Sequence, residues 1–161
     1  MAMTSSRTAV VTLPADTQIL ITRDFEAPRN LVYTAYTTPE LIKRWWGGDR
    51  GEVTLAEVDL RVGGRWRYVM TANGGFEVGF HGEYREIVPT ERIVSTEIFE
   101  GAPEAEAVVE HTFTEKNGRT TLTMLMQLPS RAVRDTIIDS GMEGGLQEAL
   151  GHLEKVALSL R

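Results

Sequence analysis

Apolar and polar residues alternate in short segments along most of this chain. In the first segment, residues 18–26, Ile19, Ile21 and Phe25 share one face and polar residues occupy the other. A period of two is typical of a strand with one buried face. The same alternation recurs in residues 52–58, 64–70, 76–88, 92–99, 107–114 and 120–128. The pattern therefore predicts seven strands, and their close succession favours antiparallel pairing.

Apolar residues at helical spacing occur in two regions. Between the first two predicted strands, Pro28 and Pro39 each precede a short apolar stripe, and proline is tolerated in the first turn of a helix. Residues 132–160 carry a longer stripe, which the glycines between residues 141 and 145 are expected to break or kink. The sequence predicts an α+β fold in which a curved sheet wraps around a long C-terminal helix, with two short helices between strands one and two.

Length and patterning indicate one domain. The chain has 161 residues, of which 42% are hydrophobic and 25% charged, as in a single globular domain. Residues 1–16 have weak patterning, so we expect a loosely ordered N-terminal arm or an edge segment before a domain at residues 17–161. A curved sheet around one helix encloses a space that side chains fill only in part, which favours a small-molecule cavity.

Composition argues against several kinds of partner. The net charge of −6 gives no basic surface for nucleic acid, and the absence of cysteine excludes disulfides and a thiolate nucleophile. No stretch has the apolar length of a signal peptide or a membrane span, so we expect a cytoplasmic protein without membrane insertion. No nucleotide motif, metal-ligand spacing or catalytic set is recognisable. We therefore predict no cofactor, no metal and no assigned catalytic residue.

Strand parity gives a set of candidate ligand-binding residues. If Phe25 faces inward, apolar side chains of the later strands and of the C-terminal helix lie on the same side. The predicted lining consists of Phe25, Trp66, Tyr68, Phe80, Glu97, Phe99, His111, Phe113, Met124, Met126, Met142 and Leu146. A methionine and aromatic stripe is more often ordinary core than a binding site, and both interpretations stay open.

Three polar residues interrupt the predicted inner face. Glu97 and His111 lie on neighbouring strands, which we expect to bring them close, either as a satisfied core pair or as a polar anchor for a ligand. Arg23 interrupts the first strand. It reaches solvent at the rim or holds a ligand carboxylate, and solvent exposure is the favoured hypothesis.

Several phrases of the sequence together resemble a known family. They are ITRDFEAPR at residues 21–29, WWG at 45–47, LRVGGRW at 60–66, GEYREIVP at 82–89 and SGMEGG at 140–145. This set is similar to the START-like superfamily, in the branch of homologues of the activator of the heat-shock-protein-90 ATPase. The resemblance covers about residues 17–160. It implies a helix-grip fold, with a seven-stranded antiparallel sheet around the C-terminal helix and an apolar cavity between them.

The resemblance leaves three functional hypotheses, because fold does not determine activity. The first is a carrier or sensor that binds a small hydrophobic molecule such as a lipid, sterol or polyketide. The second is a cyclase-type or hydratase-type enzyme in which Glu97 or His111 serves as acid or base. The third is a co-chaperone module that stimulates a chaperone ATPase. A chaperone or a second copy of the chain therefore stays open as a partner.

Overall fold

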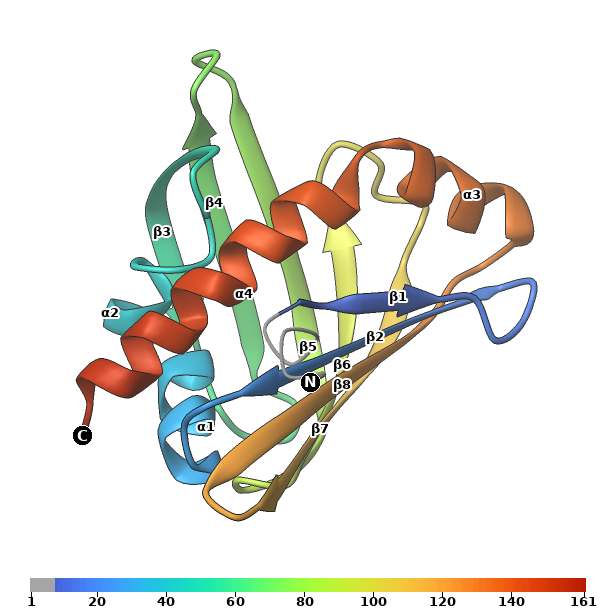
Figure 1. Cartoon of the computed structure of the whole chain (residues 1–161). Helices are drawn as coiled ribbons and strands as arrows, with labels where there is room; N and C mark the ends of the chain where they lie inside the picture. The colour runs from blue at the N-terminus through green and yellow to red at the C-terminus, as the bar shows by residue number, and fades with distance from the viewer. Residues whose placement is uncertain (1–7) are drawn as a thin grey trace.

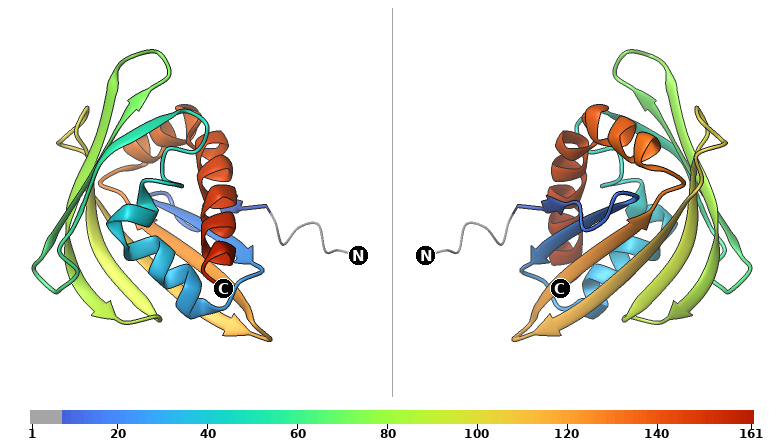
Figure 2. Two further views of the ribbon diagram at one scale, coloured as in Figure 1. Left: turned by 90° about the vertical axis from the view of Figure 1, so that its left-hand side faces the viewer. Right: turned by 90° about the vertical axis from the view of Figure 1, so that its right-hand side faces the viewer.

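The fold is a curved sheet with one long helix across its concave side (Figure 1). A computed structural model describes residues 8–161. Within these residues, eight strands pair antiparallel in the order β1-β2-β8-β7-β6-β5-β4-β3. Their bounds are β1 Val10–Thr12, β2 Gln18–Phe25, β3 Gly51–Val58, β4 Arg65–Ala72, β5 Glu77–Val88, β6 Arg92–Phe99, β7 Ala107–Lys116 and β8 Arg119–Gln127. Figure 2 shows the two arms of the sheet diverging on either side of the final helix.

The helices lie where proline and glycine allow them to begin and end. The helices α1 (Arg29–Thr37) and α2 (Pro39–Ile42) connect β2 to β3, and α3 (Arg131–Asp139) precedes α4 (Met142–Ser159). The Ser130 hydroxyl accepts a hydrogen bond from the Val133 N–H at 3.1 Å and so caps α3. Gly141, at φ 84°, separates α3 from α4, which confirms the predicted break.

The prediction of seven strands is wrong, because the sheet has eight. The additional strand, β1, lies in the segment predicted as an arm or edge segment, and it pairs with β2 at the edge of the sheet. With only three residues, of which Val10 and Thr12 are exposed, β1 is too short to give a recognisable alternation. Residues 1–7 of the predicted arm lie outside the described residues.

Alternation along β2 and the apolar stripe of α4 account for the core. On β2, Ile19, Ile21, Arg23 and Phe25 are buried on one face, while the residues that alternate with them are only half-buried. Leu150 and Leu153 of α4 meet this face, and both are almost fully buried.

Within residues 8–161, no helix combines the length and apolar character needed to cross a membrane.

Candidate functional site

The concave face of the sheet divides into two halves that differ in burial. In the packed half, side chains of β2, β7, β8 and the C-terminal part of α4 are at most 2% exposed: Phe25, Phe113, Leu122, Leu150 and Leu153. In the open half, side chains of α1, β4–β7 and the start of α4 are only half-buried: Tyr36, Tyr68, Met70, Phe80, Glu97, His111, Met142 and Leu146. The open half therefore keeps accessible apolar surface beneath the helix.

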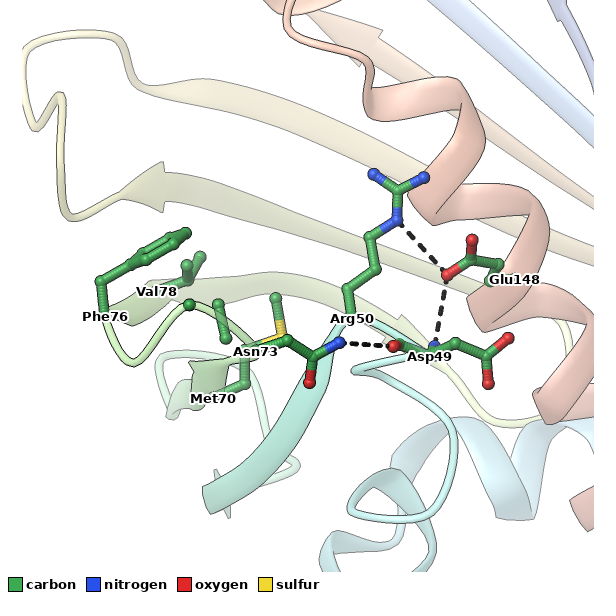
Figure 3. Close-up of a pocket in the computed structure, with 9 residues that line it drawn as sticks. Asp49, Arg50, Met70, Asn73, Phe76, Val78 and Glu148 are labelled. Carbon is green, nitrogen blue, oxygen red and sulfur yellow. Dashed lines mark hydrogen bonds and ion pairs between the residues drawn. The ribbon is translucent and has the colours of Figure 1, made fainter.

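A surface hollow of about 480 Å³ adjoins the open half (Figure 3). Its lining consists of Asp49, Arg50, Met70, Ala72, Asn73, Gly74, Phe76, Val78 and Glu148. Arg50 follows α2, and its Nε lies 3.3 Å from the Glu148 Oε1 of α4. In Figure 3, Met70, Val78 and Phe76 lie on one side of Arg50 and Glu148 on the other. This ion pair thus bridges the rim between the β4–β5 hairpin and α4.

His111 is anchored by a tyrosine from α1. The Tyr36 hydroxyl lies 2.6 Å from His111 Nδ1, and the Ser95 hydroxyl lies 3.4 Å from Nε2. The Tyr36 ring stacks on Trp45, with 5.5 Å between the ring centroids, which holds the hydroxyl in place. Burial lowers the pKa of His111 to about 4, so the imidazole is neutral near pH 7. His111 can therefore accept or donate a hydrogen bond without carrying charge.

Glu97 lies on the concave face of β6, and no counter-charge accompanies it within residues 8–161. Among residues 8–161, its carboxyl group has no hydrogen-bond or ion-pair partner, and burial alone raises its pKa to about 7. Glu97 is close enough to Tyr36 and Tyr68 for its charge to raise the pKa of both hydroxyls. A carboxyl group with this pKa is about half protonated near pH 7 and largely protonated below it.

The four tyrosines of the chain gather around this part of the interior. Burial raises the pKa of Tyr33, Tyr36, Tyr68 and Tyr84, so each keeps its hydroxyl proton. The Tyr33 hydroxyl is buried and has no hydrogen-bond partner among the described residues. Hydroxyl donors, a carboxyl of raised pKa and a neutral imidazole thus lie along one apolar wall, an arrangement that can bind oxygen-bearing groups.

The structure places the predicted lining residues on the concave side but at different depths. Phe25, Trp66, Phe113, Met124 and Met126 are buried, whereas Tyr68, Phe80, Glu97, His111, Met142 and Leu146 are half-buried. Phe99 is 41% exposed and lies at the margin of the face, where its ring is 5.2 Å from that of Phe80. That these residues contact a ligand remains a prediction.

The expected closeness of Glu97 and His111 is wrong. Glu97 pairs with Ala107, whereas His111 pairs with Ile93. The two side chains are therefore offset by four residues along antiparallel strands, or about 13 Å. No hydrogen bond or ion pair joins them among the described residues, so they do not form a core pair.

The expectation that Arg23 is exposed is also wrong. Its side chain is 3% exposed, its Nη1 lies 3.3 Å from Glu154 Oε1, and its guanidinium stands 4.7 Å above the Phe25 ring. The sequence held the signal for this pair, since Glu154 interrupts the apolar stripe of α4 as Arg23 interrupts that of β2. A charge on one buried face is costly unless an opposite charge on the facing element pairs with it.

Other residues of the open half were missed from the sequence. Tyr36 lies four residues after the buried Val32 and shares its helical stripe, and Tyr84 and Ser95 share the parity of Phe80 and Glu97. The Trp46 ring packs on Tyr68 and Phe80, at centroid distances of 5.5 and 5.7 Å. Parity and helical spacing could have found Tyr36, Tyr84 and Ser95, which share a face with residues that were predicted to line the site.

Gly82 fits the β5–β6 contact next to Glu97. The Trp66 indole N–H donates to the Thr96 carbonyl at 3.2 Å, and the Thr96 hydroxyl accepts from the Glu83 N–H at 2.9 Å. A side chain at Gly82 would collide with the Thr96 carbonyl and with the indole nitrogen. Glycine is therefore needed where the indole crosses the sheet.

Among residues 8–161, no three metal-ligating side chains cluster as a metal site would require.

Comparisons with known proteins assign the chain to a family. The model of the Activator of Hsp90 ATPase homolog 1-like protein family matches residues 26–157. A solved structure from Rhodobacter sphaeroides covers 95% of this chain and 99% of its own, with TM-score 0.87 and 24% identity. Protein Ms6760 from Mycobacterium smegmatis covers 92% and 96%, with TM-score 0.82 and 25% identity.

An AHSA1-like protein from Aeromonas hydrophila shares the fold at TM-score 0.62 and 21% identity, covering 88% of this chain and 93% of its own. No curated protein matches the sequence. The match over residues 26–157 spans most of the sheet and nearly all of α4. The chain belongs to the family of Activator of Hsp90 ATPase homolog 1-like proteins, within the START-like superfamily.

Proposed function

We propose that the protein binds a small hydrophobic molecule, such as a lipid, sterol or polyketide-like compound, as a carrier or sensor. The binding site is the open half of the concave face, between β4–β7 and the start of α4. The observation that carries this proposal is the contrast in burial across one face. Apolar side chains such as Phe80 and Leu146 stay half-buried there, while Leu150 and Leu153 on the same helix are buried.

The chemistry of the open half supports a small-molecule site. Such sites are mostly apolar and aromatic and carry a few polar groups that fix the orientation of the ligand. Trp46, Tyr68 and Phe80 supply aromatic surface, and Glu97 and His111 supply the polar groups. Membership of the START-like superfamily agrees with a ligand-binding domain in general.

The hollow beside Arg50 is the proposed route to this site. Met70 belongs both to the lining of the hollow and to the open half, so the two adjoin. The Arg50–Glu148 pair at the rim has side chains that are 50% and 32% exposed. Exposed ion pairs contribute at most about 1 kcal/mol, so opening the rim costs little.

Thermal-shift measurements on the whole chain test the proposal. The panel contains fatty acids, sterols and aromatic polyketides. A ligand at about 100 times its Kd adds about 2.7 kcal/mol of stability, which for a domain of this size raises Tm by roughly 5–10 °C. Leu146→Trp fills the open half and should abolish the shift. Leu158→Trp, at the other end of α4, should retain it.

The outcome that contradicts the proposal is specific. If no compound of the panel stabilises the protein, the carrier hypothesis fails, and stimulation of a chaperone ATPase becomes the next assay. If a ligand stabilises both tryptophan variants equally, it binds outside the open half.

A further inference from the structure

We infer that the open half selects an uncharged ligand whose carbonyl or similar oxygen accepts a hydrogen bond from the Glu97 carboxyl group. This inference rests on the proposed function and adds a ligand class to it. Its basis is the position of Glu97, which lies on the concave side of β6 beside an apolar wall and lacks a partner among residues 8–161. The carboxyl oxygens are still accessible, and a ligand that covers them has to supply a partner, because a fully buried polar group without one is costly.

No unpaired cation lies near Glu97 within residues 8–161, which argues against an anionic ligand. The buried arginines are Arg23 and Arg134. Arg23 is engaged by Glu154, and Arg134 by Asp135 and the Ala15 carbonyl. A fatty-acid carboxylate or a phosphate placed beside Glu97 would therefore lose its hydration without meeting a positive charge. A neutral oxygen avoids this cost.

The groups that surround Glu97 keep the site neutral. The titratable side chains nearest to it are Tyr36 on α1 and Tyr68 on β4, whose pKa its charge raises, and Tyr84 on β5 and His111 on β7 lie further along the same face; all four are uncharged near pH 7. On α4, Met142 and Leu146 pack toward the interior. The charged residues of α4 are engaged elsewhere or exposed: Glu148 with Arg50, His152 with Asp49, Glu154 with Arg23, and Glu143 and Lys155 in solvent.

The protonation state of Glu97 gives the inference a pH dependence. Burial raises its pKa to about 7. Below this value the carboxyl group carries the proton that it donates to the ligand. Above it, the carboxylate can only accept and repels a carbonyl oxygen, so affinity for a neutral carbonyl compound should fall as pH rises.

Three probes with the same ring system separate the possibilities: naphthalene, acetonaphthone and naphthoate. They are apolar, neutral with a carbonyl, and anionic. Binding to the whole chain is measured by calorimetry and by thermal shift at about pH 6 and about pH 8.5, on either side of the Glu97 transition. The wild type is compared with Glu97→Gln, whose amide donates at every pH, and with Glu97→Met, which removes the donor. Circular dichroism checks the fold of each variant at both pH values.

We expect acetonaphthone to bind roughly three- to tenfold more tightly than naphthalene at the lower pH, as one added hydrogen bond allows. Naphthoate should bind more weakly than acetonaphthone. Raising the pH should weaken acetonaphthone binding by about tenfold or more in the wild type. Glu97→Gln should remove this pH dependence, and Glu97→Met should reduce acetonaphthone to the affinity of naphthalene.

Two results separate failure of the inference from failure of the proposed function. If naphthalene and acetonaphthone bind equally, if naphthoate binds as well as acetonaphthone, or if Glu97→Gln keeps the pH dependence, the assignment of Glu97 is overturned while ligand binding stands. If none of the probes binds and the wider panel also gives no shift, the proposed function itself fails.

Discussion

Glu154 and Glu97 are two carboxylates on the concave side of one sheet, and their surroundings are opposite. In the packed half, Glu154 Oε1 lies 3.3 Å from Arg23 Nη1, and Oε2 accepts the Glu26 N–H at 2.8 Å. In the open half, Glu97 has neither a cation nor a donor among residues 8–161. One residue type thus has two roles, and the surrounding elements decide which.

The difference follows from how α4 crosses the sheet. Its C-terminal part packs against α1, and its Glu154 pairs with Arg23 of β2, so both charged side chains are largely buried. Its first turns carry Met142 and Leu146, which remain half-buried above β4–β6. The packed half therefore contributes most of the stability of the fold. The open half contributes less, and its incompletely buried groups are available to bind a ligand.

The largest expected effect comes from the same substitution, glutamate to glutamine, made once in each half. Glu154→Gln leaves the Arg23 guanidinium buried without its counter-charge, and we expect a loss of about 3–5 kcal/mol in unfolding free energy. Glu97→Gln removes a buried carboxyl that has no partner, so at neutral pH the variant should be at least as stable as the wild type. Urea denaturation of both variants measures the two values.

Equal losses of unfolding free energy in these two variants would contradict the contrast between the halves, because Glu97 would then have a structural partner, as Glu154 does. The variant Arg23→Met with Glu154→Gln serves as a control. Replacing both members of a buried pair by uncharged groups should recover much of the loss.

A second pair of matched variants compares leucines seven positions apart on α4. Leu153 is fully buried, and Leu153→Ala should cost about 2–5 kcal/mol through lost burial and a residual cavity. Leu146 is half-buried in the open half, so Leu146→Ala removes less buried surface and should cost about 1 kcal/mol. Thermal and urea denaturation give both values.

A similar loss for both leucines would mean that the start of α4 packs as tightly as its end. The open half would then offer no room for a ligand. Hydrogen exchange along α4 provides an independent check, since amides at its start should exchange faster than those near Leu153.

Much of this architecture could be predicted from the sequence, because it depends on local periodicity. The alternation of β2 and β6 and the break near Gly141 follow from residue order alone. The short edge strand β1 could not be found this way, because its three residues gain their structure from β2 and not from a pattern of their own.

The candidate site was less predictable, because it depends on register and on which elements meet. Parity put Glu97 and His111 on one face, but only the pairing of Glu97 with Ala107 reveals that they are far apart. Tyr36 reaches His111 across 75 positions of sequence, and Arg23 meets Glu154 from the opposite end of the chain. Long-range contacts of this kind have no local signal.

The smallest expected net effect comes from a pair of opposite pH dependences within the open half. Between pH 4.5, the ordinary pKa of the carboxyl, and about 7, folded Glu97 keeps a proton that the unfolded chain gives up, so its contribution lowers stability as pH rises. Between about 4 and 6.5, the unfolded chain protonates His111 while the folded protein does not, so this contribution raises stability with pH.

Since one unit of pKa shift corresponds to about 1.4 kcal/mol, each shift sets an upper limit of about 3.5 kcal/mol. Solvent screening of these half-buried groups lowers both contributions, and the two nearly cancel in the wild type. Urea denaturation at a series of pH values should therefore show Glu97→Gln gaining stability with pH relative to the wild type, and His111→Asn losing it. The double variant should follow the wild-type slope, because it lacks both contributions. Parallel slopes in the two single variants would show that one of these groups is solvated like a surface residue, and the open half would then lack a buried polar end.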